Sequence, residues 1–201
     1  MFAEISAKYP KHFELKNSRG ETVTIDSSSV VGRFLIDKLS MPTKAGWIEI
    51  KQEEPSSEGD AFGALAQLNF RADKEIVEIR LSKRIEADEV TSERFWTSLS
   101  YELGNASQSA EFLELRRALQ EKEITSPEFA QKTLRLEYGS VLMCQKFQDD
   151  VWRKFCKAND IECGEDDWYF PKGTTFVGWY EMLRSSEEGR AYLRVSQGEE
   201  D

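Results

Sequence analysis

The feature of this chain that most constrains its fold is a pair of long stretches with apolar residues at helical spacing. In the first, apolar residues recur at steps of three and four over Phe95–Leu113, with Thr91 or Ser92 as the N-cap. The second opens with Ser126-Pro127-Glu128, a cap followed by a proline in the first turn, and continues to Phe155. The sequence therefore predicts two long amphipathic helices.

Shorter, strand-like patterns precede these helices. Alternating apolar and polar residues flank the turn sequence Asn17–Gly20 and predict a first hairpin. A second hairpin is expected from Ala64–Phe70 and Val77–Leu81, and a further strand from Trp47–Ile50. The spacing over Val31–Leu39 predicts a short helix. We therefore expect an α+β fold, in which a small mixed or antiparallel sheet packs against two long helices and a C-terminal helix.

The C-terminal quarter of the chain is rich in aromatic residues. Trp168–Phe170 precede a proline, and beyond it large residues recur at helical steps, at Phe176, Trp179, Tyr180 and Leu183. This pattern predicts a helix docked on the main core, with the aromatic cluster as its anchor. A partner-docking surface is the alternative, because Trp and Tyr are enriched in the hot spots of interfaces.

Length and local composition bound the domain organisation. The 201 residues suit a single domain, 1–201, with one sizeable core. A polar stretch that contains proline and glycine predicts a surface loop at 52–60. The short acidic end of the chain predicts a frayed tail at 197–201.

Charge and hydropathy exclude several classes of partner. The net charge of -10 argues against nucleic acid and against an anionic membrane, because both would repel the chain. No apolar run reaches transmembrane length and the N-terminus lacks the apolar core of a secretory signal, so the protein is expected to be cytoplasmic. Cys144, Cys156 and Cys163 match neither a disulfide framework nor a zinc knuckle and are expected to be reduced thiols.

The segment Tyr101-Glu102-Leu103-Gly104-Asn105 places polar side chains in the middle of the first long helix. Tyr101 and Asn105, at i and i+4, share one helical face. On the second helix Glu137 interrupts an apolar stripe, so its carboxylate is expected to face inward, where Tyr101 and Asn105 are its predicted partners. Gly104 costs about 1 kcal/mol relative to alanine within a helix, and is expected to mark the close approach of another element.

A strand, a loop, a helix carrying x-Glu-Leu-Gly-x-Ala and a later helix that supplies a glutamate together resemble the glutamate-ligand class of zincin metallopeptidases. The resemblance covers Val77 to Phe155, and it implies a zincin-like fold. In that family a His-Glu-x-x-His motif and a later glutamate bind zinc. Carried over to this chain, Tyr101 and Asn105 stand where the two histidines would be. Glu102 stands at the position of the general base and Glu137 at that of the third zinc ligand.

The two replacements are expected to remove the family's chemistry. An amide oxygen is a poor zinc donor and an un-ionised phenol a worse one, so zinc affinity and peptidase activity should both be lost. The chain holds one histidine, His12, so a second site with two histidines cannot form. The sequence thus predicts no metal and no cofactor. It predicts a non-catalytic zincin-like protein with a binding or structural role and a protein or peptide as candidate partner; no oligomeric state follows from it.

Other interpretations of these residues stay open at this point. An enzyme of unrecognised type, or a hydrolase with an atypical site, is the alternative function. The residues at the vestigial positions could instead form a hydrogen-bonded cluster that ties two helices together, face solvent, or line a retained binding pocket. His12, beside Phe13 at the start of a strand, is expected at the surface, and no local motif pairs it with a cysteine.

Overall fold

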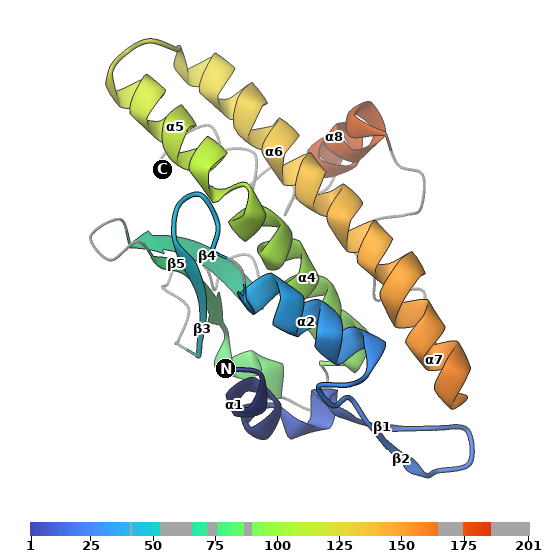
Figure 1. The fold of residues 1–201 in the computed structure, drawn as a ribbon. Helices are drawn as coiled ribbons and strands as arrows, with labels where there is room; N and C mark the ends of the chain where they lie inside the picture. The colour runs from blue at the N-terminus through green and yellow to red at the C-terminus, as the bar shows by residue number, and fades with distance from the viewer. Residues whose placement is uncertain (41, 53–65, 72–75, 87–89, 165–174, 186–201) are drawn as a thin grey trace.

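The structure has an α+β architecture, in which long helices cross the molecule beside two small sheets (Figure 1). The predicted fold class is therefore confirmed. The computed structural model describes residues 1–40, 42–52, 66–71, 76–86, 90–164 and 175–185. The strands are β1 (Glu14–Lys16), β2 (Thr22–Thr24), β3 (Trp47–Gln52), β4 (Ala66–Arg71) and β5 (Ile76–Leu81). The helices are α1 (Phe2–Lys8), α2 (Val30–Ser40), α4 (Ser92–Ser107), α5 (Ser109–Gln120), α6 (Ser126–Phe147), α7 (Arg153–Asn159) and α8 (Phe176–Ser185).

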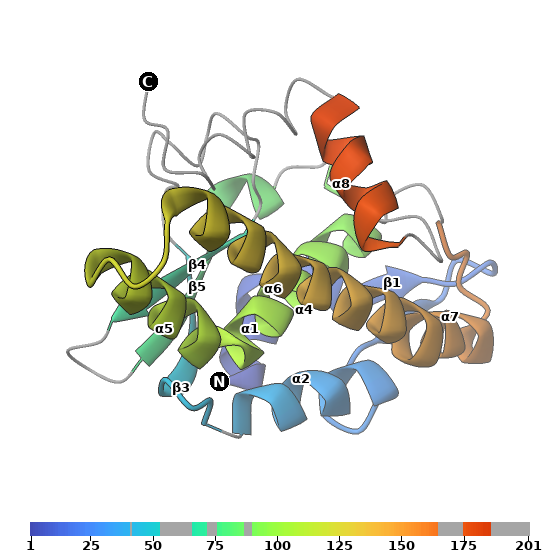
Figure 2. The ribbon, with the colours of Figure 1, turned by 90° about the horizontal axis from the view of Figure 1, so that it is seen from above.

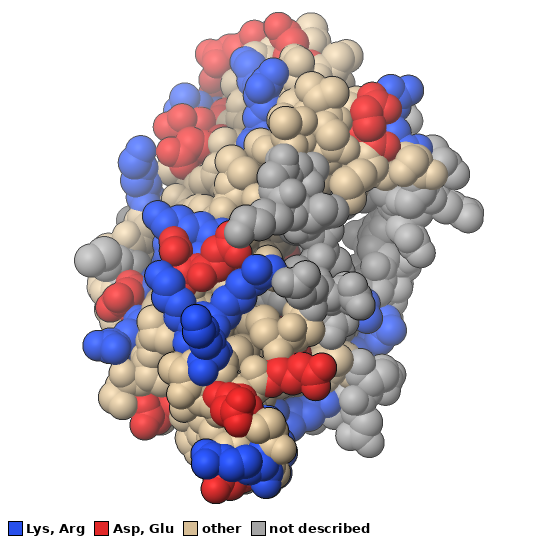
Figure 3. Space-filling model, turned by 90° about the vertical axis from the view of Figure 1, so that its right-hand side faces the viewer, with Lys and Arg blue, Asp and Glu red and all other residues tan. Residues whose placement is uncertain are grey.

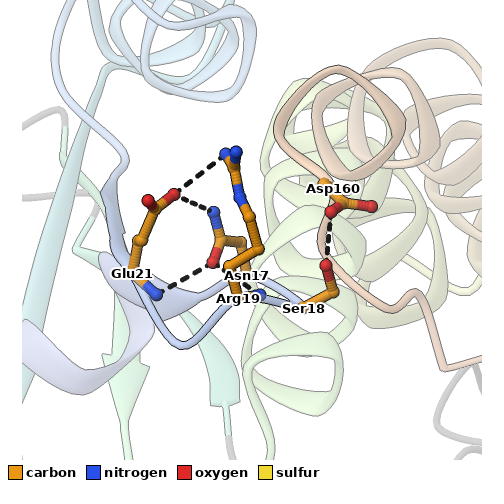
Figure 4. Close-up of polar contacts among 5 residues, drawn as sticks. All are labelled: Asn17, Ser18, Arg19, Glu21 and Asp160. Carbon is orange, nitrogen blue, oxygen red and sulfur yellow. Dashed lines mark hydrogen bonds and ion pairs between the residues drawn. The ribbon is translucent and has the colours of Figure 1, made fainter.

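The predicted first hairpin is present as the antiparallel pair β1 and β2. Its turn holds Gly20 at a φ of 76°, a left-handed conformation that favours glycine. The Asn17 side chain closes the turn, because its carbonyl oxygen accepts the backbone N–H groups of Arg19 and Glu21 at 3.0 and 2.8 Å (Figure 4). The residue choice in the turn thus sets the hairpin.

The same turn is attached to the far end of the long helices. The backbone N–H of Ser18 donates to the carbonyl oxygen of Asp160 at 2.8 Å, and the Ser18 hydroxyl donates to the Asp160 carboxylate (Figure 4). Asp160 ends α7 with a left-handed φ of 57°. This contact joins segments 142 residues apart in the sequence.

The larger sheet has the order β3-β5-β4, with β3 parallel and β4 antiparallel to the central strand. The mixed sheet and its second hairpin agree with the sequence-based expectation. Ile48 lies opposite Val77, and both are buried in the same core as Leu99 of α4. Burial of this apolar face against the helices positions α4.

The opposite face of the sheet carries a buried carboxylate with two cationic partners. Glu78 on β5 is fully buried and lies 2.6 Å from both the Lys51 ammonium and the Arg80 guanidinium nitrogen. Burial alone would raise the pKa of Glu78, but the hydrogen bonds and charges of Lys51 and Arg80 outweigh it and hold that pKa below its usual value.

The first long helix is shorter than predicted. The apolar stripe continues to Leu113, but the helix is interrupted at Gln108, between α4 and α5. Thr91 is the N-cap of α4, and its side chain accepts the backbone N–H of Arg94 at 3.1 Å. Periodicity did not reveal the break, since α4 and α5 keep their apolar residues in nearly the same phase.

The second long helix forms over the predicted range, with a local change of pitch. The π-helical turn Gln148–Trp152 joins α6 to α7 without ending the rod. The N-cap of α6 is Thr125 rather than the predicted Ser126, because a capping box forms between Thr125 and Glu128. The backbone N–H of Thr125 donates to the Glu128 carboxylate at 2.8 Å.

Aromatic rings pack the core around Trp96 of α4, which is fully buried. The Trp96 ring centroid lies 5.2 Å from that of Phe13 and 6.1 Å from those of Phe147 and Trp152. These contacts pack the N-terminal segment and the segment α6–α7 against the same side chain of α4. α2 and α8 lie on opposite flanks of the rod (Figure 2).

No helix within the described residues is long and apolar enough to cross a membrane. On the face shown in Figure 3, acidic and basic side chains lie next to one another rather than in separate patches. Gln52 is the last residue of β3, and the rest of the predicted loop at 52–60 lies outside the described residues. So do the tail at 197–201 and the aromatic run Trp168–Phe170.

Candidate functional site

Tyr101, Glu102, Asn105 and Glu137 lie where α4 and α6 pack tightly against each other. A Cβ atom added at Gly104 would lie 3.0 Å from both the Cα and the Cβ of Ser140, closer than side-chain atoms normally pack. The expectation that Gly104 marks a close approach is confirmed. Because the two backbones meet here, polar side chains one turn to either side can reach across the interface.

Tyr101 and Glu137 meet across this interface. The Tyr101 hydroxyl donates a hydrogen bond to the Glu137 carboxylate, and both residues are partly buried. The pairing predicted from the interrupted stripe on the second helix is thus confirmed. It also makes neighbours of the two residues that the zincin resemblance assigns to the first histidine and the third ligand.

Asn105 connects Glu102 to α6. Its amide nitrogen donates to the Glu102 carboxylate at 3.2 Å, and its carbonyl oxygen accepts the Ser140 hydroxyl at 2.5 Å. These are the hydrogen bonds that the structure describes for Asn105, so its role differs from the predicted pairing with Glu137. Glu102 and Asn105 are both buried, which contradicts the solvent-facing interpretation for these two residues.

Gln108 extends this chain of hydrogen bonds. Its amide nitrogen donates to the Ser140 hydroxyl oxygen at 2.9 Å and to the Leu136 carbonyl oxygen at 3.0 Å. Each residue thus donates to the next one in a single chain: Gln108 to Ser140, Ser140 to Asn105, and Asn105 to Glu102. Tyr101, Glu102, Asn105, Gln108, Glu137 and Ser140 are called the inter-helix polar cluster below.

Two members of the cluster were not predicted from the sequence. Gln108 follows Asn105 by three positions and Ser140 follows Glu137 by three, so each lies on the same helical face as a predicted residue. That spacing was the available signal. What it lacked was the register between the two helices, which Gly104 sets through its contact with Ser140.

Glu102 has a strongly perturbed carboxyl group. Its side chain is 8% exposed, and burial raises its pKa to about 8, with a further contribution from the negative charge of Glu137. The hydrogen bond from Asn105 acts in the opposite direction but is outweighed. At pH 7 the Glu102 carboxyl is therefore mainly protonated and neutral.

The polar cluster does not fit zinc. At the two positions that the zincin resemblance assigns to histidines, the donor groups are a phenol and an amide, and each already takes part in a hydrogen bond within the cluster. A neutral Glu102 adds no anionic ligand. Throughout the described ranges, no three His, Cys, Asp or Glu side chains are grouped so that they could hold a metal ion.

His12 lies in the core, not at the surface as predicted. It ends a 3-10 turn, Pro10–His12, and its ring stacks on Phe95 at 4.4 Å between centroids. Its Nε2 lies 2.9 Å from the Ile85 carbonyl oxygen. Burial lowers the pKa of His12 to about 4, although the bond to Ile85 opposes the shift and the charge of Lys11 adds to it. The surface prediction was wrong because the turn packs against the start of α4, a contact that the neighbouring residues in the sequence do not indicate.

The three cysteines are free thiols, as expected. Burial raises the pKa of Cys144 to about 12, and a hydrogen bond from Ser100 only partly opposes the shift. Burial and the neighbouring Cys163 raise the pKa of Cys156 as well. Thiols with raised pKa values supply little thiolate at neutral pH, so Cys144 and Cys156 are poor nucleophiles.

A cavity of about 470 Å³ lies between the first turns of α6 and α8, apart from the polar cluster. The residues that line it include no carboxylate, histidine or cysteine. They are Ser126, Pro127, Ala130, Gln131, Leu134, Phe176 and Tyr180.

Comparisons with known proteins found no relative of this chain. No protein-family model matches the chain, and neither the curated proteins nor the solved structures contained a match.

Proposed function

We propose that this chain is a non-catalytic protein of zincin-like type, in which the former metal site has become a hydrogen-bonded joint between two helices, and that the protein serves a binding role. The observation that carries the proposal is the contact of Tyr101 with Glu137. A zincin of the glutamate-ligand class needs its first motif residue and its third ligand to face each other across two helices. The pair meets that requirement with residues that bond to each other.

The protonation state of Glu102 supports a non-catalytic role. A general base must be ionised and must contact the water that it activates. Glu102 is buried and has a pKa of about 8, so at pH 7 the neutral form outnumbers the carboxylate by about ten to one. Its partner Asn105 donates a hydrogen bond to it and accepts one from Ser140, so both ends of this amide are engaged within the cluster.

An enzyme of another type is the second candidate, because a buried carboxyl with a raised pKa is typical of catalytic acids. Such an acid needs space for a substrate beside it. The cavity between α6 and α8 is not lined by Glu102 or Glu137. The non-catalytic proposal therefore accounts better for the described part of the chain.

Restoring the two histidines tests the zincin geometry directly. In the double variant Tyr101→His/Asn105→His, the imidazoles would join Glu137 as a complete ligand set. We expect this variant to bind one zinc ion per chain, measured by elemental analysis after dialysis, and to give the absorption spectrum of a tetrahedral site with cobalt. Adding Glu137→Gln to the pair should lower the zinc affinity at least tenfold.

A matched control separates a built site from an accidental pair of histidines. Arg116 and Gln120 are both exposed on α5 and also stand at i and i+4, so Arg116→His/Gln120→His creates a two-histidine pair of the same spacing on another helix. Zinc binding by a folded Tyr101→His/Asn105→His variant that is no tighter than in this control would contradict the zincin-like arrangement. One zinc ion per chain in the wild-type protein would contradict the non-catalytic proposal.

A further inference from the structure

Two of the three cysteines meet at the C-terminal end of α7. Cys156 lies in the last turn of this helix and is 1% exposed, whereas Cys163 follows the helix and is partly exposed. The Cys163 thiol is close enough to that of Cys156 to raise its pKa both by charge and through a hydrogen bond. Cys144 lies elsewhere, between α4 and α6, where its thiol accepts the Ser100 hydroxyl at 3.2 Å.

The chain reverses between Cys156 and Cys163, and the reversal brings the two thiols together. Asp160 ends α7 with a left-handed φ of 57°. The next backbone N–H, that of Ile161, donates to the Cys156 carbonyl oxygen at 3.0 Å. The reversal is also held from outside, because Ser18 of the first hairpin bonds to Asp160 (Figure 4).

A second contact fixes the segment directly after Cys163. The backbone N–H of Gly164 donates to the carboxylate of Glu93, in the first turn of α4, at 3.4 Å. Cys163 therefore lies between two tethers, the reversal at Asp160 and this bond to α4. Both thiols also pack within the main core. A solvent-accessible thiol held beside a buried one is the arrangement in which a reversible disulfide can form.

We propose that Cys156 and Cys163 are an oxidisable pair, which hydrogen peroxide converts to an intramolecular disulfide and a small thiol restores. Peroxide first oxidises the partly exposed Cys163 thiol to a sulfenic acid and is itself reduced to water. The Cys156 sulfur then attacks the Cys163 sulfur and the S–O bond breaks. The Cys156 thiol proton leaves with the hydroxide as a second water. Neither step involves the inter-helix polar cluster.

Burial makes Cys156 a poor nucleophile towards molecules in solution, but the second step differs in two respects. The Cys163 sulfur is already beside it, so no encounter is needed. Oxidation of Cys163 also removes the thiol hydrogen bond and the negative charge that help to raise the pKa of Cys156. Desolvation of Cys156 remains, so closure of the disulfide should be the slower step. Dimedone, which reacts with sulfenic acids, should therefore label Cys163 and not Cys156.

Mass spectrometry of the full-length protein after treatment with hydrogen peroxide tests the pair. We expect the folded chain to lose two hydrogen atoms and to keep one thiol, that of Cys144, for alkylation in urea. Trypsin cuts after Lys154 and Lys157, so the disulfide should link the peptide Phe155–Lys157 to the peptide that begins at Ala158. Dithiothreitol should restore all three thiols.

Two variants and the unfolded chain are the controls. Cys163→Ser removes the thiol that peroxide reaches and should leave Cys156 as a thiol. Cys144→Ala is the matched control and should form the disulfide at a rate similar to that of the wild type. In urea, where the fold no longer selects the partners, all three cysteines should enter disulfides. If Cys144→Ala does not fold, the thiol count of the wild type decides.

Hydrogen exchange measures whether the disulfide closes in the native geometry. The Ile161 amide lies inside the ring that the disulfide would close, so it should exchange about tenfold more slowly in the oxidised protein than in the reduced protein. Equal exchange in the two forms would overturn the proposal, because the disulfide would then require an unfolded end of α7. A dimer linked through Cys163, or oxidation of Cys163 to a sulfinic acid while Cys156 stays a thiol, would overturn it as well.

Discussion

Glu102 illustrates how burial can change the role of a single residue. In the unfolded chain its carboxyl has an ordinary pKa near 4.5, and in the folded protein the pKa is about 8. The folded state thus holds a proton that the unfolded state releases as the pH rises from 4.5 to 8. Through this group, the free energy of unfolding is greatest below pH 4.5 and decreases as the pH rises towards 8.

Replacement Glu102→Gln should remove that dependence, because glutamine is neutral in both states. Between pH 5 and pH 8, we expect the free energy of unfolding of the variant to rise by about 3 kcal/mol relative to that of the wild type. Urea unfolding at the two pH values measures the change. Glu114→Gln, at an exposed position of α5, is the control and should follow the wild type. Parallel pH profiles for Glu102→Gln and the wild type would show that Glu102 ionises normally in the folded protein.

His12 has the opposite dependence. Its folded-state pKa of about 4 lies below the ordinary value of 6.5, so the unfolded chain binds a proton that the folded core rejects. The contribution is complete above pH 6.5 and is lost as the pH falls towards 4. Between pH 7 and pH 4, the free energy of unfolding of His12→Gln should therefore fall by about 3 kcal/mol less than that of the wild type. Urea unfolding at the two pH values measures this difference. An unchanged acid limb in the variant would mean that other groups control acid unfolding.

At the scale of elements, the contact of α4 with α6 depends on two glycines in unlike surroundings. A Cβ at Gly104 would meet the Cα and Cβ of Ser140 at 3.0 Å, atoms that cannot move without shifting α6. A Cβ at Gly139 would meet the Gln108 amide oxygen at 2.8 Å, but this is the end of a flexible side chain. The two positions therefore differ in how easily the neighbour can yield.

Alanine substitutions at these positions should separate the two cases. We expect Gly104→Ala to lower the free energy of unfolding by about 1–3 kcal/mol despite the better helix propensity of alanine. Gly139→Ala should cost less, because Gln108 can rotate away. Thermal or urea unfolding of both variants measures the difference. If Gly104→Ala were the more stable of the two, α4 and α6 would not be in tight contact at Ser140.

At the scale of the whole molecule, the contributions of His12 and Glu102 oppose each other over pH 4.5–6.5. Stability rises with pH through His12, which packs on Phe95 near the start of α4, and falls through Glu102 of α4. Replacement of either residue should leave the pH dependence of the free energy of unfolding that the other residue causes. In this range the two contributions nearly cancel, which is a property of the assembled fold and not of one site.

Sequence patterns determined much of the local structure. The hairpin at Asn17–Gly20, the start of the second long helix near Pro127 and the amphipathic α8 all follow from residue preferences that act within a few positions. The pairing of Tyr101 with Glu137 was also accessible, because a carboxylate in an apolar stripe must find a partner on the facing helix.

Only the tertiary structure decided where His12 lies, where the first long helix breaks and which partners Asn105 takes. Each depends on contacts between residues far apart in the chain: His12 with Phe95, and Asn105 with Ser140. The register of two helices and the burial of a side chain follow from the packing of the whole core, and residue order along one segment does not encode them. The raised pKa of Glu102 belongs to this second group, since burial is its main cause.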